Sequence, residues 1–289
     1  MSSYEAVKTI NNLQKYDKPN MITKSFEIYS NLDETQKNEF VIVALLKCCK
    51  QMIKKKMDII TMNVINDIKI TLINTDNNNI FAKRLLMSIY TDCKDITNAL
   101  KIFDSIPQNE QSILSIGTMM KQCINHNKND KAILIYEQYN GQHNDVSDLL
   151  FIKACTNIGD ADKGIKLIKS ITNDSIEFTN SVINFYGKIG DVNNAVNTFN
   201  NIPEDKKDIV TIGAMMKCFI DNYQNEKAIS IYEQYNHYKY DDISNTLFIK
   251  ACTNIGDADK GIKLIKSTTN DSIEFTNSVI NFYGKIGDV

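Results

Sequence analysis

One segment of this chain is a near-identical copy of another. Residues 151–192 recur 97 positions later as residues 248–289, and over these 42 positions the copies differ once, at Ile171 and Thr268. Self-similarity at a fixed period is the signature of a repeat architecture, in which each unit buries its apolar face by stacking on its neighbours. The fold of this chain must therefore accommodate the same unit more than once.

Three shorter units make up this long period, at residues 146–174, 175–208 and 209–242. Each reads as two short amphipathic helices. In the middle unit the apolar residues fall at steps of three and four, which places them on one helix face. Asp191 is expected to cap the second helix, which should bury Ala195 and Phe199 and end at Pro203. The sequence therefore predicts an all-α fold, a solenoid of stacked helix-turn-helix repeats for which we expect a right-handed α-α superhelix.

The same pattern extends in both directions from the long period. Because no Pro-rich or Gly-rich linker interrupts it, we expect residues 1–289 to form a single continuous domain. Its last copy stops at Val289, where a second helix should begin, so we expect either a truncated sequence, which we favour, or an end that packs on another chain. The remaining predicted parts are N-terminal helices over 1–39 (a cap near Tyr4–Tyr16 and a lone second helix near Ile22–Leu32), a divergent repeat over 40–79 with an insertion around Lys54–Lys56, repeats at 80–111, 112–145 and 243–271, and a truncated repeat at 272–289.

Composition is that of a soluble protein. Hydrophobic residues make up 43% and charged residues 24%, and the formal net charge of −2 provides no global basic field to attract nucleic acid or acidic membranes. No apolar run is long enough to span a bilayer, and the N-terminus lacks a clear signal or transit peptide. The seven cysteines form no CxxC pair and have no His at zinc-finger spacing. They are expected to be buried thiols in a reducing intracellular compartment, whose identity stays open.

Sequence motifs for catalysis are missing. The three histidines, His126, His143 and His237, are expected in turns or linkers between helices. The chain has no glycine-rich phosphate loop, no G-x-S-x-G, no H-E-x-x-H and no zinc-deaminase signature. The sequence therefore predicts a protein that is not an enzyme, with no cofactor, no metal and no small-molecule substrate.

Ordered short motifs point to a family. The phrases NSVINFYGKIGD, FNNIP and AMM follow one another between Asn180 and Met216, and ACTNIGD stands at residues 154–160. This order resembles the pentatricopeptide repeat proteins, and most closely their branch with alternating long, short and standard motifs. The resemblance covers about residues 40 to 289. Tetratricopeptide repeats are the nearest rival, but this chain has no Trp and its Pro203 follows Phe199 by four residues rather than eight.

The resemblance implies single-stranded RNA as the ligand, read base by base through two residues of each repeat. Transferred to this chain, these are Asn180 with Asp208, a pair that favours uracil by resemblance. Asn277 is the later equivalent of Asn180. Other repeats supply Asp145, Asp242 and Ser175, whose partners Gly117, Gly213 and Leu150 depart from the pattern.

Each of these residues also has a structural interpretation. Asn180 can be an ordinary helix residue and Asp208 a helix cap. Lysines that could contact phosphates can equally form solvated surface; they are Lys153, Lys163, Lys166, Lys169 and, in a loop, Lys54–Lys56. Between residues 146 and 242 there are 14 acidic residues against 10 lysines, so phosphate binding would need lysines gathered on one face.

Two functions remain open. The first is an RNA-binding adaptor that positions a transcript for processing, stability or editing by partner proteins that supply catalysis. The second is a scaffold that binds a protein partner as a peptide or helix in its concave groove.

Overall fold

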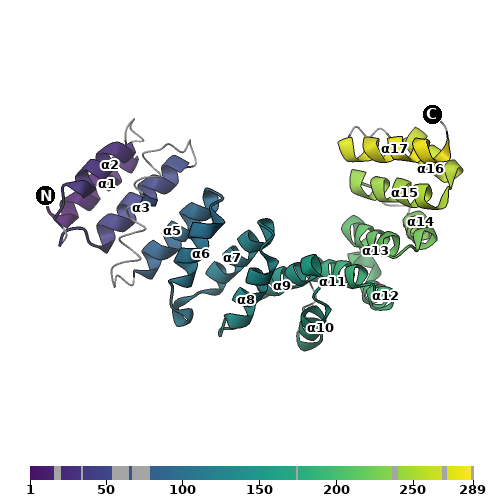
Figure 1. Cartoon of the computed structure of the whole chain (residues 1–289), viewed down its shortest axis with the longest axis horizontal. Helices are drawn as coiled ribbons and strands as arrows, with labels where there is room; N and C mark the ends of the chain where they lie inside the picture. Colours follow the sequence, from purple (N-terminus) through teal and green to yellow (C-terminus); the bar gives the residue numbers. More distant parts are fainter. Residues whose placement is uncertain are drawn as a thin grey trace. The chain divides into compact units, whose positions relative to one another are not determined.

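The computed structural model describes residues 1–15, 21–33, 35–53, 65–66, 79–173, 175–235, 240–268 and 272–287. Over these ranges the chain is a succession of helices without a β-strand (Figure 1). They fall into two compact units, Met1–Gln142 and His143–Val289. The insertion around Lys54–Lys56 lies outside the described residues.

The first unit is built from helical hairpins. Helix α1 packs against α2, α5 against α6, and α7 against α8, while α3 packs against α1, α2 and α5. The helices α1, α3 and α5 thus stack in series. Helices α1 and α5 are each the first helix of a hairpin, and we count α3 with the first helices because it stacks between them. The bounds are α1 Ser3–Lys15, α2 Met21–Ser30, α3 Glu39–Ile53, α5 Ile80–Asp92, α6 Ile96–Asp104, the 3₁₀ helix η1 Gln108–Glu110, α7 Ile113–Asn125 and α8 Asn129–Gln138.

The second unit repeats this plan with greater regularity. Its first helices α9, α11, α13, α15 and α17 each pack against the next, and the second helices α10, α12, α14 and α16 each pack against the first helix of their own hairpin. The bounds are α9 Asp145–Ile158, α10 Ala161–Ser170, α11 Ile176–Ile189, α12 Val192–Asn200, the 3₁₀ helix η2 Glu204–Lys206, α13 Ile209–Asp221, α14 Asn225–Gln234, α15 Asp242–Ile255, α16 Ala258–Ser267 and α17 Ile273–Ile286.

The hairpin turn shows why this sequence folds in this way. Helix α11 ends at Gly190, whose φ of +83° lies in the left-handed region that glycine adopts without strain. Asp191 then caps α12 by accepting a hydrogen bond from the backbone N–H of Asn194 at 3.1 Å, as predicted. Ala195 and Phe199 on α12 are buried, with 0% and 6% of their surface exposed, which confirms the predicted register.

Glycine also determines how closely the second helix of one hairpin packs against the first helix of the next. A Cβ added at Gly164 on α10 would lie 2.2 Å from Cζ of Phe185 on α11, and one at Gly261 on α16 would lie 2.2 Å from Cζ of Phe282 on α17. Only a residue without a side chain lets these rings fill the space between the helices. Both rings are completely buried.

These observations confirm the predicted all-α fold of stacked helix-turn-helix repeats. The right-handed sense of the superhelix and the single continuous domain stay predictions. None of the described helices is both long and apolar enough to cross a membrane.

Candidate nucleic-acid interface

An exposed apolar residue stands in the first turn of most first helices. In the first unit these residues are Phe40, Phe81 and Leu114, and in the second unit they are Val146, Val210, Ile243 and Ile273. Each lies off the buried stripe of its helix. Such a recurrent set of exposed apolar side chains indicates a binding surface, because large apolar residues are otherwise mostly buried in this fold.

An exposed lysine follows many of these apolar residues by seven positions. The pairs are Phe40 with Lys47, Leu114 with Lys121, Val146 with Lys153, Val210 with Lys217, and Ile243 with Lys250. Seven residues are about two helical turns, so both members of a pair lie on the same face, about 10 Å apart along the axis. None of these five lysines forms an ion pair with another described residue. We call this set the apolar–lysine face of the first helices.

Among the predicted phosphate contacts that the structure describes, only Lys153 therefore lies on this face. Lys163, Lys166 and Lys169 all belong to the second helix α10. Lys166 and Lys169 are exposed there and Lys163 is partly covered. Sequence reasoning missed Lys47, Lys121, Lys217 and Lys250; the seven-residue spacing from an apolar first-turn residue is the signal that could have identified them.

The last residues of the repeats lie at the N-termini of the first helices. Asp208 is the N-cap of α13, where its Oδ1 accepts hydrogen bonds from the backbone N–H and the hydroxyl of Thr211, both at 2.8 Å. Its Oδ2 accepts no hydrogen bond from a described residue. Ser175 is the N-cap of α11 in the same way, through the backbone N–H of Phe178 at 3.3 Å. Both residues thus have a structural role, which leaves one oxygen of Asp208 available.

Asp145 and Asp242 occupy the corresponding positions without capping. They are the first residues of α9 and α15, and both are exposed. Their neighbours Asn144 and Asp241 are the caps. The carboxylates of Asp145 and Asp242 are therefore free to meet a ligand at the edge of the apolar–lysine face.

Asn180 lies one turn into α11, which packs directly against α13. Its side chain is only 6% exposed, and its Oδ1 is buried without a hydrogen-bond partner. A buried amide oxygen without a partner is costly, and a ligand donor would relieve that cost. Asn277, its copy on α17, is exposed instead.

Two repeats have a glycine at the position equivalent to Asn180. A Cβ at Gly117 on α7 would meet nothing within 4 Å, and at Gly213 on α13 it would meet only the Ser244 hydroxyl, at 3.7 Å. These two positions thus have room for a longer side chain. Leu150, which stands at this position on α9, is buried.

Cysteine chemistry does not contribute to this face. Burial raises the pKa of Cys123 and Cys218 to about 11 and that of Cys252 to about 12, so these thiols are protonated at neutral pH. A protonated thiol is a weak nucleophile and a poor metal ligand. In the described part of the chain, no three His, Cys, Asp or Glu side chains are grouped so that they could hold a metal ion.

The fold and this face together define a class of protein, a helical-repeat protein that presents one binding surface along its first helices. Sequence comparisons narrow the class. A pentatricopeptide repeat-containing protein of Arabidopsis thaliana is 24% identical over 194 residues, which cover 65% of this chain and 33% of that protein. A chloroplastic pentatricopeptide repeat-containing protein of the same plant is 26% identical over 214 residues, covering 69% and 24%. No family model matches the chain.

Comparison with solved structures agrees with the sequence comparisons. The crystal structure of the pentatricopeptide repeat protein PPR10 from maize superposes with a TM-score of 0.63 at 13% identity, covering 100% of this chain and 47% of that one. PPR10 bound to an 18-nucleotide psaJ RNA element gives the same score. The chain is similar to pentatricopeptide repeat proteins in sequence and in fold, as the sequence resemblance predicted. It spans between about a quarter and a third of the length of these two curated relatives. Membership of the branch with alternating long, short and standard motifs stays a prediction.

Proposed function

We propose that this chain binds single-stranded RNA on the apolar–lysine face of its first helices. The observation that carries the proposal is the pairing of an exposed apolar residue with an unpaired lysine two turns along the same helix. Single-stranded nucleic acid needs both features, because its bases present flat faces for apolar contact and its phosphates need cations. The pairing recurs in five first helices, as a repeated nucleotide would require.

The acidic composition does not oppose this arrangement. On each of these helices the lysine is exposed and forms no ion pair with a described residue, whereas Asp208 and Asp191 are engaged as helix caps. The phosphates would therefore contact the positive charge of these lysines, and the net negative charge of the chain matters less. RNA bound to PPR10, a protein with the same fold, supports the choice of ligand.

Base preference should come from Asn180 and Asp208. Rotation of the Asn180 amide about χ2 exchanges its oxygen and nitrogen, so that the amide can accept from a base N–H or donate to a base carbonyl. Oδ2 of Asp208 offers a second acceptor. Uracil presents an N–H between two carbonyls, so we expect this repeat to prefer uracil. Asp145, Asp242, Ser175 and Asn277 belong to repeats that lack one of the two reading residues and should contribute little preference.

We further propose that the protein acts as an adaptor, which holds a transcript while partner proteins process, stabilise or edit it. A scaffold for a protein ligand is the other candidate, but nothing in the described residues favours it on the first-helix face. An apolar patch for a protein partner would not need a lysine at the same spacing in helix after helix.

Binding to four single-stranded RNA homopolymers over a series of salt concentrations tests this proposal. We expect modest affinity, oligo(U) ahead of oligo(A), and an affinity that falls with salt. Lys153→Gln should reduce the slope of log affinity against log salt by about 0.7, the value for one phosphate contact on a single strand. Lys166→Gln, which removes an exposed lysine from the second helix α10, is the matched control and should leave the slope unchanged. Negligible binding of all four homopolymers would overturn the proposal.

A further inference from the structure

Two clefts occupy equivalent places in the two units. The cleft of the first unit measures about 290 Å³ and lies beside the end of α6 and helix α8. The cleft of the second unit measures about 330 Å³ and is lined by α12, η2, α13 and α14. The repeats that form them are related by an offset of 96 residues, so each position in one cleft has a counterpart in the other.

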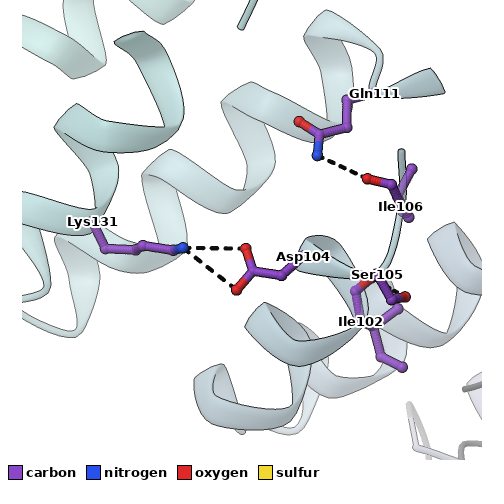
Figure 2. Close-up of polar contacts among 6 residues, drawn as sticks. All are labelled: Ile102, Asp104, Ser105, Ile106, Gln111 and Lys131. Atoms are coloured by element: carbon purple, nitrogen blue, oxygen red, sulfur yellow. Dashed lines mark hydrogen bonds and ion pairs between the residues drawn. The ribbon is translucent and has the colours of Figure 1, made fainter. Parts of the chain in front are cut away.

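A carboxylate of the chain itself neutralises the lysine beside the first cleft. Nζ of Lys131 on α8 bonds both oxygens of Asp104 on α6, at 3.1 and 3.4 Å (Figure 2). In the same view the amide of Gln111 donates to the backbone carbonyl of Ile106 at 3.1 Å. Lys131 and Gln111 therefore both bond groups of the chain itself.

Several substitutions change the second cleft. Asn200 stands in place of Asp104, Lys207 in place of Gln111, Glu204 in place of Gln108, and Phe219 in place of Cys123. The lysine equivalent to Lys131 is Lys227, which keeps its place but has lost its carboxylate. It forms no ion pair with a described residue, and its Nζ lies 5.8 Å from the centre of the Phe219 ring.

The other cation of the second cleft is already neutralised. Nζ of Lys207 donates to Oε2 of Glu204 at 2.7 Å and lies 4.7 Å from the centre of the Phe199 ring. The hydroxyl of Tyr235 also donates to this carboxylate, at 3.4 Å. Lys227 therefore leaves the second cleft with one uncompensated positive charge beside a floor of aromatic rings.

The second cleft also faces away from the proposed RNA surface. Helix α13 contributes Met215 and Phe219 to the cleft, whereas its Val210 belongs to the apolar–lysine face. At 3.6 residues per turn, Met215 and Phe219 point about 140° and about 180° away from Val210 around the helix. A strand of RNA along the first-helix face would not pass this cleft, so the two surfaces can hold different ligands.

We propose that the second cleft binds an acidic peptide segment of a partner protein, with a carboxylate on Lys227 and a neighbouring apolar side chain over Phe219 and Val196. The chain itself indicates a carboxylate, because Asp104 supplies one to the equivalent lysine of the first unit. An apolar neighbour fits the aromatic floor. The volume of about 330 Å³ lies at the lower end of the range for ligand pockets, about 300–1,000 Å³, and suits a short segment.

Selection of random twelve-residue peptides displayed on phage, with the full chain as target, tests this proposal. The selected peptides should carry Asp or Glu next to a large apolar residue. One of them, made synthetically with a fluorescent label, should lose about tenfold in affinity to the variants Asn200→Asp and Lys227→Gln. Asn200→Asp supplies the internal carboxylate of the first unit through a side chain of the same size at the end of α12. Selected peptides without acidic residues, or affinity for either variant equal to that for the unsubstituted chain, would overturn the proposal.

The converse variant and an RNA competition sharpen the test. Asp104→Asn removes the internal carboxylate from Lys131 and should create a second site for the same peptide, detectable as a change in stoichiometry from one to two. This site should be weaker, because Cys123 stands there in place of Phe219. Unchanged stoichiometry would show that the lysine and its missing carboxylate do not define the site. Oligo(U) should not displace the peptide, and Asn200→Asp should leave RNA binding intact. Displacement of the peptide by RNA would make RNA the occupant and contradict the peptide proposal. A chain that bound the peptide but no RNA would overturn the proposed function and leave the peptide proposal standing.

Discussion

Residues 151–192 and 248–289 have almost the same sequence but different surroundings. Ile183 on α11 is completely buried, whereas its copy Ile280 on α17 is 65% exposed. Asn180 and Asn277 differ in the same way. Helix α13 packs against α11 and covers these side chains, while no described helix follows α17. In this fold the neighbouring repeat, and not the helix itself, decides which residues on this side of a first helix belong to the core.

Contacts with the preceding repeat are the same in both copies. Phe185 and Phe282 are completely buried, each against a glycine on the second helix of the preceding hairpin, Gly164 or Gly261. The two copies therefore separate two kinds of stabilisation, one from the preceding repeat and one from the following repeat. Matched substitutions can measure each of them.

The largest effect should come from the ring that packs against the preceding hairpin. Phe185→Ala and Phe282→Ala should each loosen this contact by about 3–5 kcal/mol, because each leaves a cavity against a glycine that cannot fill it. Amide hydrogen exchange of α11 and α17 reports each contact separately. A loss confined to Phe185→Ala would show that even this contact depends on the next repeat.

A smaller and unequal effect is expected for the isoleucines. Ile183→Ala should cost about 2–5 kcal/mol, since the side chain is fully buried between α11 and its neighbours. Ile280→Ala should change the free energy of unfolding by less than about 0.5 kcal/mol, because its side chain is mostly in solvent. Denaturant unfolding followed by circular dichroism measures both. Equal losses would mean that α17 is covered in solution.

Two glycine-to-alanine substitutions should change the free energy of unfolding in opposite directions. A Cβ at Gly187 would lie 3.0 Å from the Cα and Cβ of Cys218 on α13, so Gly187→Ala should destabilise by about 1–3 kcal/mol. A Cβ at Gly284 would meet nothing within 4 Å, and Gly284→Ala should stabilise α17 by up to about 1 kcal/mol through helix propensity. Melting temperatures of the two variants should move in opposite directions. A fall for both would contradict the open environment of Gly284.

The sequence predicted those features that a single repeat determines. The helix hairpins, the Asp191 cap and the burial of Ala195 and Phe199 follow from periodicity and local capping chemistry, and the structure confirms them. The likeness to pentatricopeptide repeat proteins followed from the order of short motifs, and the comparisons agree with it.

Features that depend on packing between helices could not be read in the same way. Lys153 and Lys166 look alike in the sequence, but one lies on a first helix and the other on a second helix. The ion pair of Lys131 with Asp104 joins residues 27 apart, and only the packing of α8 beside α6 brings them together. The unpaired oxygen of Asn180 likewise depends on burial by a neighbouring repeat. A sequence pattern predicts which residues share a face of a helix, but it does not predict which residues of another helix pack against that face.

Removal of the Asn180 amide tests most directly whether this chain reads the bases of RNA. Asn180→Ala removes one amide whose oxygen has no partner, so the fold should tolerate it well. The ratio of oligo(U) to oligo(A) affinity should fall close to one in this variant, while affinity for the backbone remains. Asn277→Ala removes the identical residue from an exposed position and should keep the ratio of the unsubstituted chain. An unchanged ratio in Asn180→Ala, or an equal fall in both variants, would contradict base reading at Asn180.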